Sequence, residues 1–389
     1  MIDALRSLLA ATIVVAAAPI VVALVPGRIP QVVALILGGV AIGPSCLGVG
    51  DPAAVALFAN LGLGFLFLLA GYELEPSLMR DREGRLAIAS WVVSALAAIV
   101  IVGALAHVGI VRAFVPVAIG LTTTALGTLL PMLREHGMHD GPLGRNVLAA
   151  GAVGEMGPVL AIAILLGHHG SLVEVAGVAA VAAVAFVLSV VPRLVRGTVL
   201  GRIVADRAHD TSQTTLRLTL LLLVLLLLLS AEFGLDVVLG AFFAGMVLRR
   251  ADVADVTTLE HKLDAVGYGF FIPVFFVSSG MGLHVQSIAE APGRLLVCFI
   301  LLCAVRGLPA LVLYRHTLPL VRRVQLALLS ATALPLLVAL SEVGLANGSM
   351  LPENAAALVG AGVLSVAVFP MVAIRLEPRA RQAPAATHD

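Results

Sequence analysis

One acidic residue lies in the middle of a long apolar stretch of this sequence. Glu155 stands near the centre of residues 142–168, where its neighbours are mainly Ala, Gly, Val, Leu and Ile. A charged side chain at the centre of a membrane helix costs about 2.5–3.5 kcal/mol on insertion scales, and such residues usually serve ion or proton pathways. Arg306 is the one basic residue at a similar depth, inside residues 293–314. One acid and one base at mid-depth indicate a carrier of ions or protons.

The composition places both residues in an integral membrane protein. Of 389 residues, 60% are hydrophobic and 12% are charged, whereas soluble domains carry about 25% charged residues. The apolar runs are continuous rather than alternating, which favours helices over an outer-membrane barrel. The net charge of +1 gives no reason to expect a nucleic-acid partner. The sequence has no intramembrane Ser/His dyad, metal motif or Gly-rich nucleotide loop, so neither an enzyme nor a bound cofactor is expected.

Thirteen apolar segments are candidate membrane-spanning helices, because a span needs about 20 apolar residues. Their expected limits are 5–25, 29–47, 52–72, 86–108, 113–133, 142–168, 171–191, 215–232, 236–250, 265–281, 293–314, 323–343 and 354–374. The expected fold class is therefore an all-α polytopic membrane protein.

The basic residues divide unevenly between the two sides of such a bundle. One side carries only Arg6, Arg112 and Arg294, and Arg306 lies within the membrane, so 20 of the 24 Lys and Arg residues fall on the other side. Loops rich in Lys and Arg face the cytoplasm. We therefore expect a multi-pass protein of the cytoplasmic membrane, with the N-terminus outside and the C-terminus in the cytoplasm.

The two halves of the sequence resemble each other. The segments LG at 37–38, LGLGF at 61–65 and TAL at 124–126 match LG at 239–240, VGYGF at 266–270 and TAL at 332–334, with offsets of 202, 205 and 208 residues. A shift by an odd number of helices inverts the second copy, and inverted repeats are typical of alternating-access transporters. We expect repeat one at about 5–168, a linker helix at 171–191 and repeat two at 215–374.

Each copy contains one helix that its own sequence weakens. The weakening residues carry hydroxyls or are glycine and proline: Thr122, Gly127 and Pro131 in the first helix, and Ser330, Thr332 and Pro335 in the second. Proline removes a backbone donor, and broken backbone at this depth survives only where it lines a cavity or is buried in protein. We expect two broken crossover helices whose oxygens, with the hydroxyls of Thr123 and Thr124, coordinate a cation at the midplane. A pair of kinked packing helices is the alternative.

Four segments resemble a known family of membrane proteins. They are LGGVAIGPSCLG at 37–48, LGLGFLFLLAGYEL at 61–74, LGAFFAGMVL at 239–248 and LDAVGYGFFIPVFFVSSGMGL at 263–283. They are similar to the sodium/hydrogen exchanger domain, and within it to the monovalent cation:proton antiporter-2 family. The similarity runs in order along the chain, so the expected domain covers 1–376 and is followed by a short cytoplasmic tail at 377–389. The resemblance implies a mobile core domain, a scaffold domain, a homodimer formed through the scaffold, and elevator-type movement of the core.

The resemblance also assigns the site residues. The sixth helix of that family carries two acids, or an amide followed by an acid, and the matching positions here are Gly154 and Glu155. One side chain is therefore missing, and the acid is Glu rather than Asp. The family's basic residue in the helix before the second crossover matches Arg306. A single acid with an arginine is more similar to electroneutral members, while the departure at Gly154 leaves the ion and the coupling ratio open.

These observations predict exchange of a monovalent cation, Na⁺ or K⁺, for H⁺. Glu155 would bind the proton or the cation but never both, and Thr123 and Thr124 would complete an oxygen shell. Gly154 would leave room for a water molecule, and Arg306 would hold Glu155 when neither ion is bound. One alternative is a cation-coupled symporter of an organic anion, for which a second basic residue at mid-depth is missing. The other is a non-transporting membrane sensor, for which no sizeable soluble domain is present.

Overall fold

The computed structural model describes residues 2–24, 30–73, 80–108, 111, 113–139, 141–165, 171–195, 213–250, 256–290, 292–346 and 348–376. Every regular element within these ranges is a helix, which confirms the all-helical prediction. Nine helices of the described part are long and apolar enough to cross a membrane, and shorter apolar helices cover Gln31–Ile42 and Val175–Val190. The count of thirteen spans stays a prediction, and the expected tail at 377–389 lies outside the described residues.

The helices follow the apolar segments because backbone groups in a membrane must find their hydrogen bonds within the protein. The first half contains α1 (Ile2–Leu24), α2 (Gln31–Ile42), α3 (Pro52–Glu73), α4 (Arg82–His107), α5 (Phe114–Gly120), α6 (Leu126–Glu135), α7 (Gly141–Leu165) and α8 (Ser171–Val195). The second half contains α10 (Thr214–Glu232), α11 (Val237–Arg250), α12 (Val256–Val266), η1 (Gly267–Phe271), α13 (Ile272–Met281), α14 (Val285–Glu290), α15 (Pro292–Leu302), η2 (Cys303–Gly307), α16 (Leu308–Leu313), η3 (Tyr314–His316), α17 (Leu320–Ser330), α18 (Pro335–Ala346) and α19 (Pro352–Arg375).

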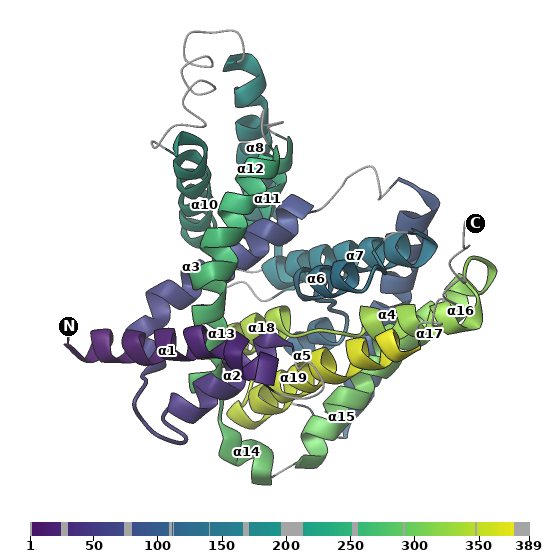
Figure 1. Cartoon of the computed structure of the whole chain (residues 1–389). Coiled ribbons are helices and arrows are strands. Elements are labelled where there is room, and N and C mark those ends of the chain that lie inside the picture. Colours follow the sequence, from purple (N-terminus) through teal and green to yellow (C-terminus); the bar gives the residue numbers. More distant parts are fainter. Residues whose placement is uncertain are drawn as a thin grey trace, which may run out of the picture.

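A first group of helices packs closely through glycines. In this group α3 contacts α11 and α13, α2 contacts α13, α1, α8 and α10 lie against these helices, and α12 contacts α10 and η1. A Cβ added to Gly71 or Gly39 would lie 2.1 Å from a carbonyl oxygen, that of Phe242 or of Val277 respectively. Small residues let helix backbones approach in this way. The group occupies the left and the top of Figure 1.

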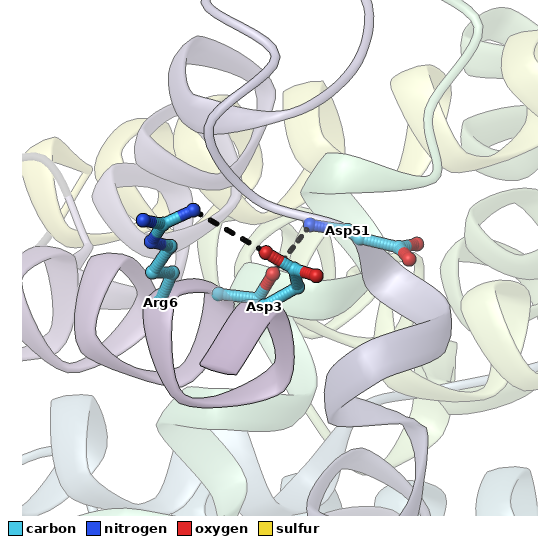
Figure 2. Close-up of polar contacts among 4 residues, drawn as sticks. Asp3, Arg6 and Asp51 are labelled. Atoms are coloured by element: carbon cyan, nitrogen blue, oxygen red, sulfur yellow. Dashed lines mark hydrogen bonds and ion pairs between the residues drawn. The ribbon is translucent and has the colours of Figure 1, made fainter. Parts of the chain in front are cut away.

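The N-terminal helix α1 is tied to the start of α3. Figure 2 shows the backbone amide of Asp51 pointing at α1, where it donates to the hydroxyl of Ser7 at 3.1 Å. Ser7 is buried, so the bond gives its hydroxyl a partner at the edge of the interior. The neighbouring ion pair between Arg6 and Asp3, at 3.4 Å, is exposed on one face of α1 and contributes little to stability.

A second group of helices is built around α7 and α19. Helix α7 contacts α4, α5, α6 and α17, and helix α19 contacts α15, α17 and α18. A Cβ added to Gly157 of α7 would lie 2.5 Å from the ring of Trp91, so that glycine sets the distance between α7 and α4. This group forms the right of Figure 1 and contains both interrupted helices.

Candidate functional site

Two helices of the second group unwind in the protein interior. The backbone is not helical at residues 121–125, between α5 and α6, or at residues 331–334, between α17 and α18, and both segments are buried. The two segments contact each other directly, because the amide of Ala125 donates to the carbonyl oxygen of Thr332 at 2.8 Å. The two breaks therefore form one structural unit.

The residues expected to cause the breaks lie in or beside them. Thr122 and Thr332 belong to the unwound segments, and Ser330 is the last residue of α17. Pro335 is the first residue of α18, a position at which the missing N–H of proline has no helical partner to lose.

The first break is shorter than expected, because Gly127 and Pro131 lie within α6. Pro131 has no N–H to donate to the carbonyl oxygen of Gly127, four residues earlier. The hydroxyl of Tyr268, in η1, donates to that oxygen instead, at 3.4 Å. Tyr268 was not among the predicted site residues, because it is separated from its partner Gly127 by 141 residues of sequence.

Threonine hydroxyls satisfy carbonyl groups at the end of α5. Thr122 Oγ1 donates to the carbonyl oxygen of Ile119 at 2.7 Å, and Thr123 Oγ1 donates to that of Gly120 at 2.8 Å. A hydroxyl that donates its proton still has lone pairs with which it can coordinate a cation. Thr123 therefore has the chemistry expected of a cation ligand.

Glu155 closes the first break from the neighbouring helix α7. Its Oε1 accepts from the backbone amide of Leu126 at 2.7 Å and from that of Gly127 at 3.4 Å. These amides belong to the first turn of α6, where N–H groups have no partner within the helix and the helix dipole is positive. The side chain is 7% exposed, so the carboxylate stands in the interior and is held by the positive end of a helix.

Pro158 frees a carbonyl group of α7 for the same break. Because proline lacks an N–H group, Pro158 cannot donate to the carbonyl oxygen of Gly154. The amide of Thr124 donates to this oxygen at 3.0 Å. The residue beside Glu155 thus holds the break through its backbone. Sequence reasoning missed Pro158, although its four-residue spacing from Gly154 is visible in the sequence.

Arg306 lies against the same threonine. Its Nε donates to Thr124 Oγ1 at 3.0 Å, and its Nη2 donates to the carbonyl oxygen of Ala150 at 2.8 Å. The Thr124 hydroxyl in turn donates to the carbonyl oxygen of Ser330 at 2.6 Å. In the described part of the chain, Arg306 reaches the site through Thr124 and not through the expected ion pair with Glu155.

Gly154 is a position at which no side chain fits. An added Cβ would lie 2.5 Å from Thr124 Oγ1 and 2.7 Å from Nη2 of Arg306. The space expected to hold a water molecule beside Gly154 is therefore filled by these two side chains. Gly154 contributes its carbonyl oxygen and its small size.

A small cavity lies where the two breaks face α3. Its volume is about 10 Å³, about what one water molecule needs. It is lined by Leu66, Phe67 and Ala70 of α3, by Thr123, Thr124, Ala125 and Gly127, by Glu155, and by Ala333, Leu334, Pro335 and Leu336. A carboxylate and two threonines are hard oxygen ligands, which suit a cation of this size. The described residues contain no group of three or more His, Cys, Asp and Glu side chains placed to hold a metal ion.

The sequence of this chain is similar to those of known membrane proteins. A sequence model of the family "Sodium/hydrogen exchanger, transmembrane" matches residues 9–375. The chain is similar to "Cation/H(+) antiporter 18" of Arabidopsis thaliana, with 27% identity over 68% of this chain and 35% of the relative. It is also similar to "Putative Na(+)/H(+) antiporter YjbQ" of Bacillus subtilis (strain 168), with 26% identity over 71% of this chain and 47% of the relative. The alignments thus span less than half the length of these curated relatives.

The fold is similar to that of a solved antiporter. The structure of the sodium proton antiporter MjNhaP1 from Methanocaldococcus jannaschii at pH 8 superimposes with a TM-score of 0.65, at 18% sequence identity, over 95% of this chain and 94% of the other. At this identity the likeness concerns the fold alone. The family match extends over nearly all of the sequence, and the chain belongs to the transmembrane sodium/hydrogen exchanger family.

Proposed function

We propose that this chain is a secondary antiporter that exchanges a monovalent cation, Na⁺ or K⁺, for H⁺ across the cytoplasmic membrane. Glu155 is the shared carrier, which binds the proton and the cation in turn. The observation that carries the proposal is the position of Glu155 in α7: its buried carboxylate accepts from the first backbone amide of α6 and lines a cavity of about 10 Å³ between the two breaks.

The carboxylate of Glu155 needs a positive partner in the interior. Burial of an unpaired charge is strongly unfavourable, so the group must be neutralised by a proton or by a cation. A cavity with room for about one water-sized particle admits one of these at a time. Thr123 and Thr124 supply further oxygen ligands for the cation. The proton binds to the carboxylate of Glu155 and needs no further ligand.

The names of the relatives support the same reaction class. One is called a cation/H(+) antiporter and the other a putative Na(+)/H(+) antiporter. The cavity counts against the alternative of an organic-anion symporter, since it has room for about one water molecule and an organic carboxylate is larger than that.

We also propose thirteen spans arranged as an inverted repeat. Gly38 of α2 packs on Val14 of α1, and Gly240 of α11 packs on Leu226 of α10. These two glycines are 202 residues apart, and each belongs to the second helix of its copy and contacts the first. Equivalent contacts at equivalent positions support the repeat.

The two groups of helices suit an elevator-type mechanism. The second group carries Glu155, Arg306 and both breaks, while the first supplies the wall of α3 that faces the cavity. We assign the second group as the mobile core and the first as the scaffold, through which a homodimer would form. The N-terminus would lie outside and the C-terminus in the cytoplasm, as the distribution of Lys and Arg indicates.

The test is exchange by the purified protein in proteoliposomes. A preset pH gradient should be dissipated by external Na⁺ or K⁺ without any organic anion. Glu155→Gln should abolish exchange, because the amide can neither bind a proton nor neutralise a cation, and Glu155→Asp should retain part of it. Glu353→Gln, at the start of α19 and away from the cavity, is the matched control. Exchange at the normal rate by Glu155→Gln would remove the proposed mechanism.

A further inference from the structure

A second and larger cavity lies at the Pro52 end of α3. Its volume is about 370 Å³, and it is bordered by α3, α18, α19, the end of α13 and the segment that follows α13. Six polar side chains line it: Asn60, Ser278, Ser279, His284, Ser341 and Glu342. No part of the mechanism above uses this cavity.

The polar wall of this cavity includes an exposed carboxylate. Glu342 is exposed, and Ser279 Oγ donates to its Oε1 at 3.4 Å. A carboxylate and a hydroxyl supply the hard oxygen ligands that suit a hydrated cation. The cavity can therefore take up water together with a cation.

The second cavity lies in line with the cavity at Glu155. Leu334, whose carbonyl oxygen accepts from the amide of Val338 in the first turn of α18, lines the first cavity, while Val338, Ser341 and Leu345 of α18 line the second. Residues spaced by three and four positions share one face of a helix, and the seven residues from Leu334 to Ser341 span about 10 Å. On α3 the same face runs from Phe67, at the first cavity, through the buried Leu63 to Asn60, at the second. The two cavities thus follow one seam, separated by apolar side chains.

Charge and size define what the second cavity can bind. Glu342 is the one carboxylate among the described residues that line it. The remaining lining groups offer hydroxyl, amide and imidazole side chains. Because a water molecule in the liquid occupies about 30 Å³, there is room for a small cation with its shell of water.

We propose that this cavity is a second cation site, which holds the hydrated monovalent cation through the carboxylate of Glu342 and the hydroxyl of Ser279 on its way to or from Glu155. For the identity of its cargo the inference rests on the proposed antiport function. The charge distribution of the sequence places the Pro52 end of α3 on the expected outer side, so the site would serve the outer solution.

The test compares cation affinity at the two faces of the membrane. Initial exchange rates are measured in right-side-out and in everted membrane vesicles as the concentration of Na⁺ or K⁺ is varied. Glu342→Gln should raise the half-saturating concentration at its own face by about three- to tenfold, and by clearly less at the other face. Glu342→Asp, which keeps the charge, should restore most of the affinity. Glu290→Gln, a carboxylate at the end of α14 outside the cavity, is the matched control.

A purely structural role of Glu342 is separated by ionic strength. Attraction by a partly hydrated carboxylate is screened by salt, so choline chloride should reduce the advantage of the unmodified protein over Glu342→Gln. Equal changes at both faces, no change, or the same change in Glu290→Gln would overturn the proposal.

Occupancy is measured separately from transport. Crystals of the full chain soaked in Tl⁺ should give an anomalous peak beside Glu342, which Glu342→Gln should lose while any peak at Glu155 persists. A cavity without such a peak would overturn the second site. Failure of exchange with the peak present would instead count against the antiport function.

Discussion

Ala125 and Thr332 lie in the two unwound segments, one in each. A backbone hydrogen bond of 2.8 Å joins them, from the amide of Ala125 to the carbonyl oxygen of Thr332. The hydroxyl of Thr124 adds a second link, to the carbonyl oxygen of Ser330 at 2.6 Å. Backbone groups freed by unwinding in one helix are thereby satisfied by the other. Neither break can be rearranged without exposing unpaired groups in the second, so we expect both to move together.

Gly154→Ala should strongly reduce exchange. The added Cβ would lie 2.5 Å from Thr124 Oγ1 and 2.7 Å from Arg306 Nη2, which forces one or both away from the break. Overpacking of a buried position typically costs about 1–3 kcal/mol, and Gly154→Asp should be at least as damaging. Thermal unfolding in detergent and exchange in proteoliposomes measure both effects. Gly103→Ala in α4 is the control, because its Cβ would make only an ordinary contact, at 3.6 Å from Phe114.

Thr124→Val should destabilise the protein, whereas Thr124→Ser should be nearly neutral. Valine has the same shape but leaves Arg306 Nε and the carbonyl oxygen of Ser330 without this hydroxyl. Unsatisfied buried groups cost about 1–3 kcal/mol each, and more where one is charged. Serine keeps the hydroxyl. Equal melting temperatures for the two variants would contradict the assigned bonds.

Pro158→Ala should lower exchange without lowering stability. Alanine restores an N–H group that can bond to the carbonyl oxygen of Gly154, in competition with the amide of Thr124. Alanine also favours a helix interior over proline by about 3 kcal/mol, so α7 itself should gain stability. Pro370→Ala in α19 is the matched change of a proline inside a helix away from the cavity. Full activity of Pro158→Ala would mean that this carbonyl bond is dispensable.

Ser365→Ala should destabilise the second break. The hydroxyl of Ser365 accepts from the amide of Ala333 at 3.0 Å and donates to the carbonyl oxygen of Gly362 at 2.7 Å. Its loss leaves a buried amide unpaired, at a cost of about 1–3 kcal/mol. Ser94→Ala is the matched control, because that buried hydroxyl bonds only to the carbonyl oxygen of Ser90 on its own helix, at 3.0 Å. Chemical or thermal unfolding should therefore separate the two variants.

The apparent affinity for the cation should fall as the pH falls. A proton on Glu155 excludes the cation, and by linkage each ligand weakens the other by the same factor. Once the carboxyl is mostly protonated, the half-saturating cation concentration should rise by up to about tenfold per pH unit. Rates measured at several pH values with saturating cation should change much less. A half-saturating concentration independent of pH would contradict competition at a shared site.

The sequence by itself predicted an all-helical membrane protein and which charged residues lie within its apolar segments. Hydropathy is a property of consecutive residues, so the apolar runs predicted the helices, and Glu155 and Arg306 were visible as charges within them. Thr122 and Thr332 lie in the two unwound segments, and hydroxyl, glycine and proline residues weaken helices wherever they occur. The extension of the first break to Gly127 and Pro131 failed, because the capping of Leu126 by Glu155 restarts the helix earlier.

Only the tertiary structure decided which partners these residues have. Arg306 binds a threonine 182 residues away, and the two breaks meet although 206 residues separate Thr124 from Ser330. Whether Gly154 faces a water molecule or the guanidinium of Arg306 depends on how closely α7, η2 and the first break pack. This packing distance cannot be predicted from the residues next to Gly154 in sequence. Local chemistry fixes what each residue can do, and the distances between distant segments fix what it meets.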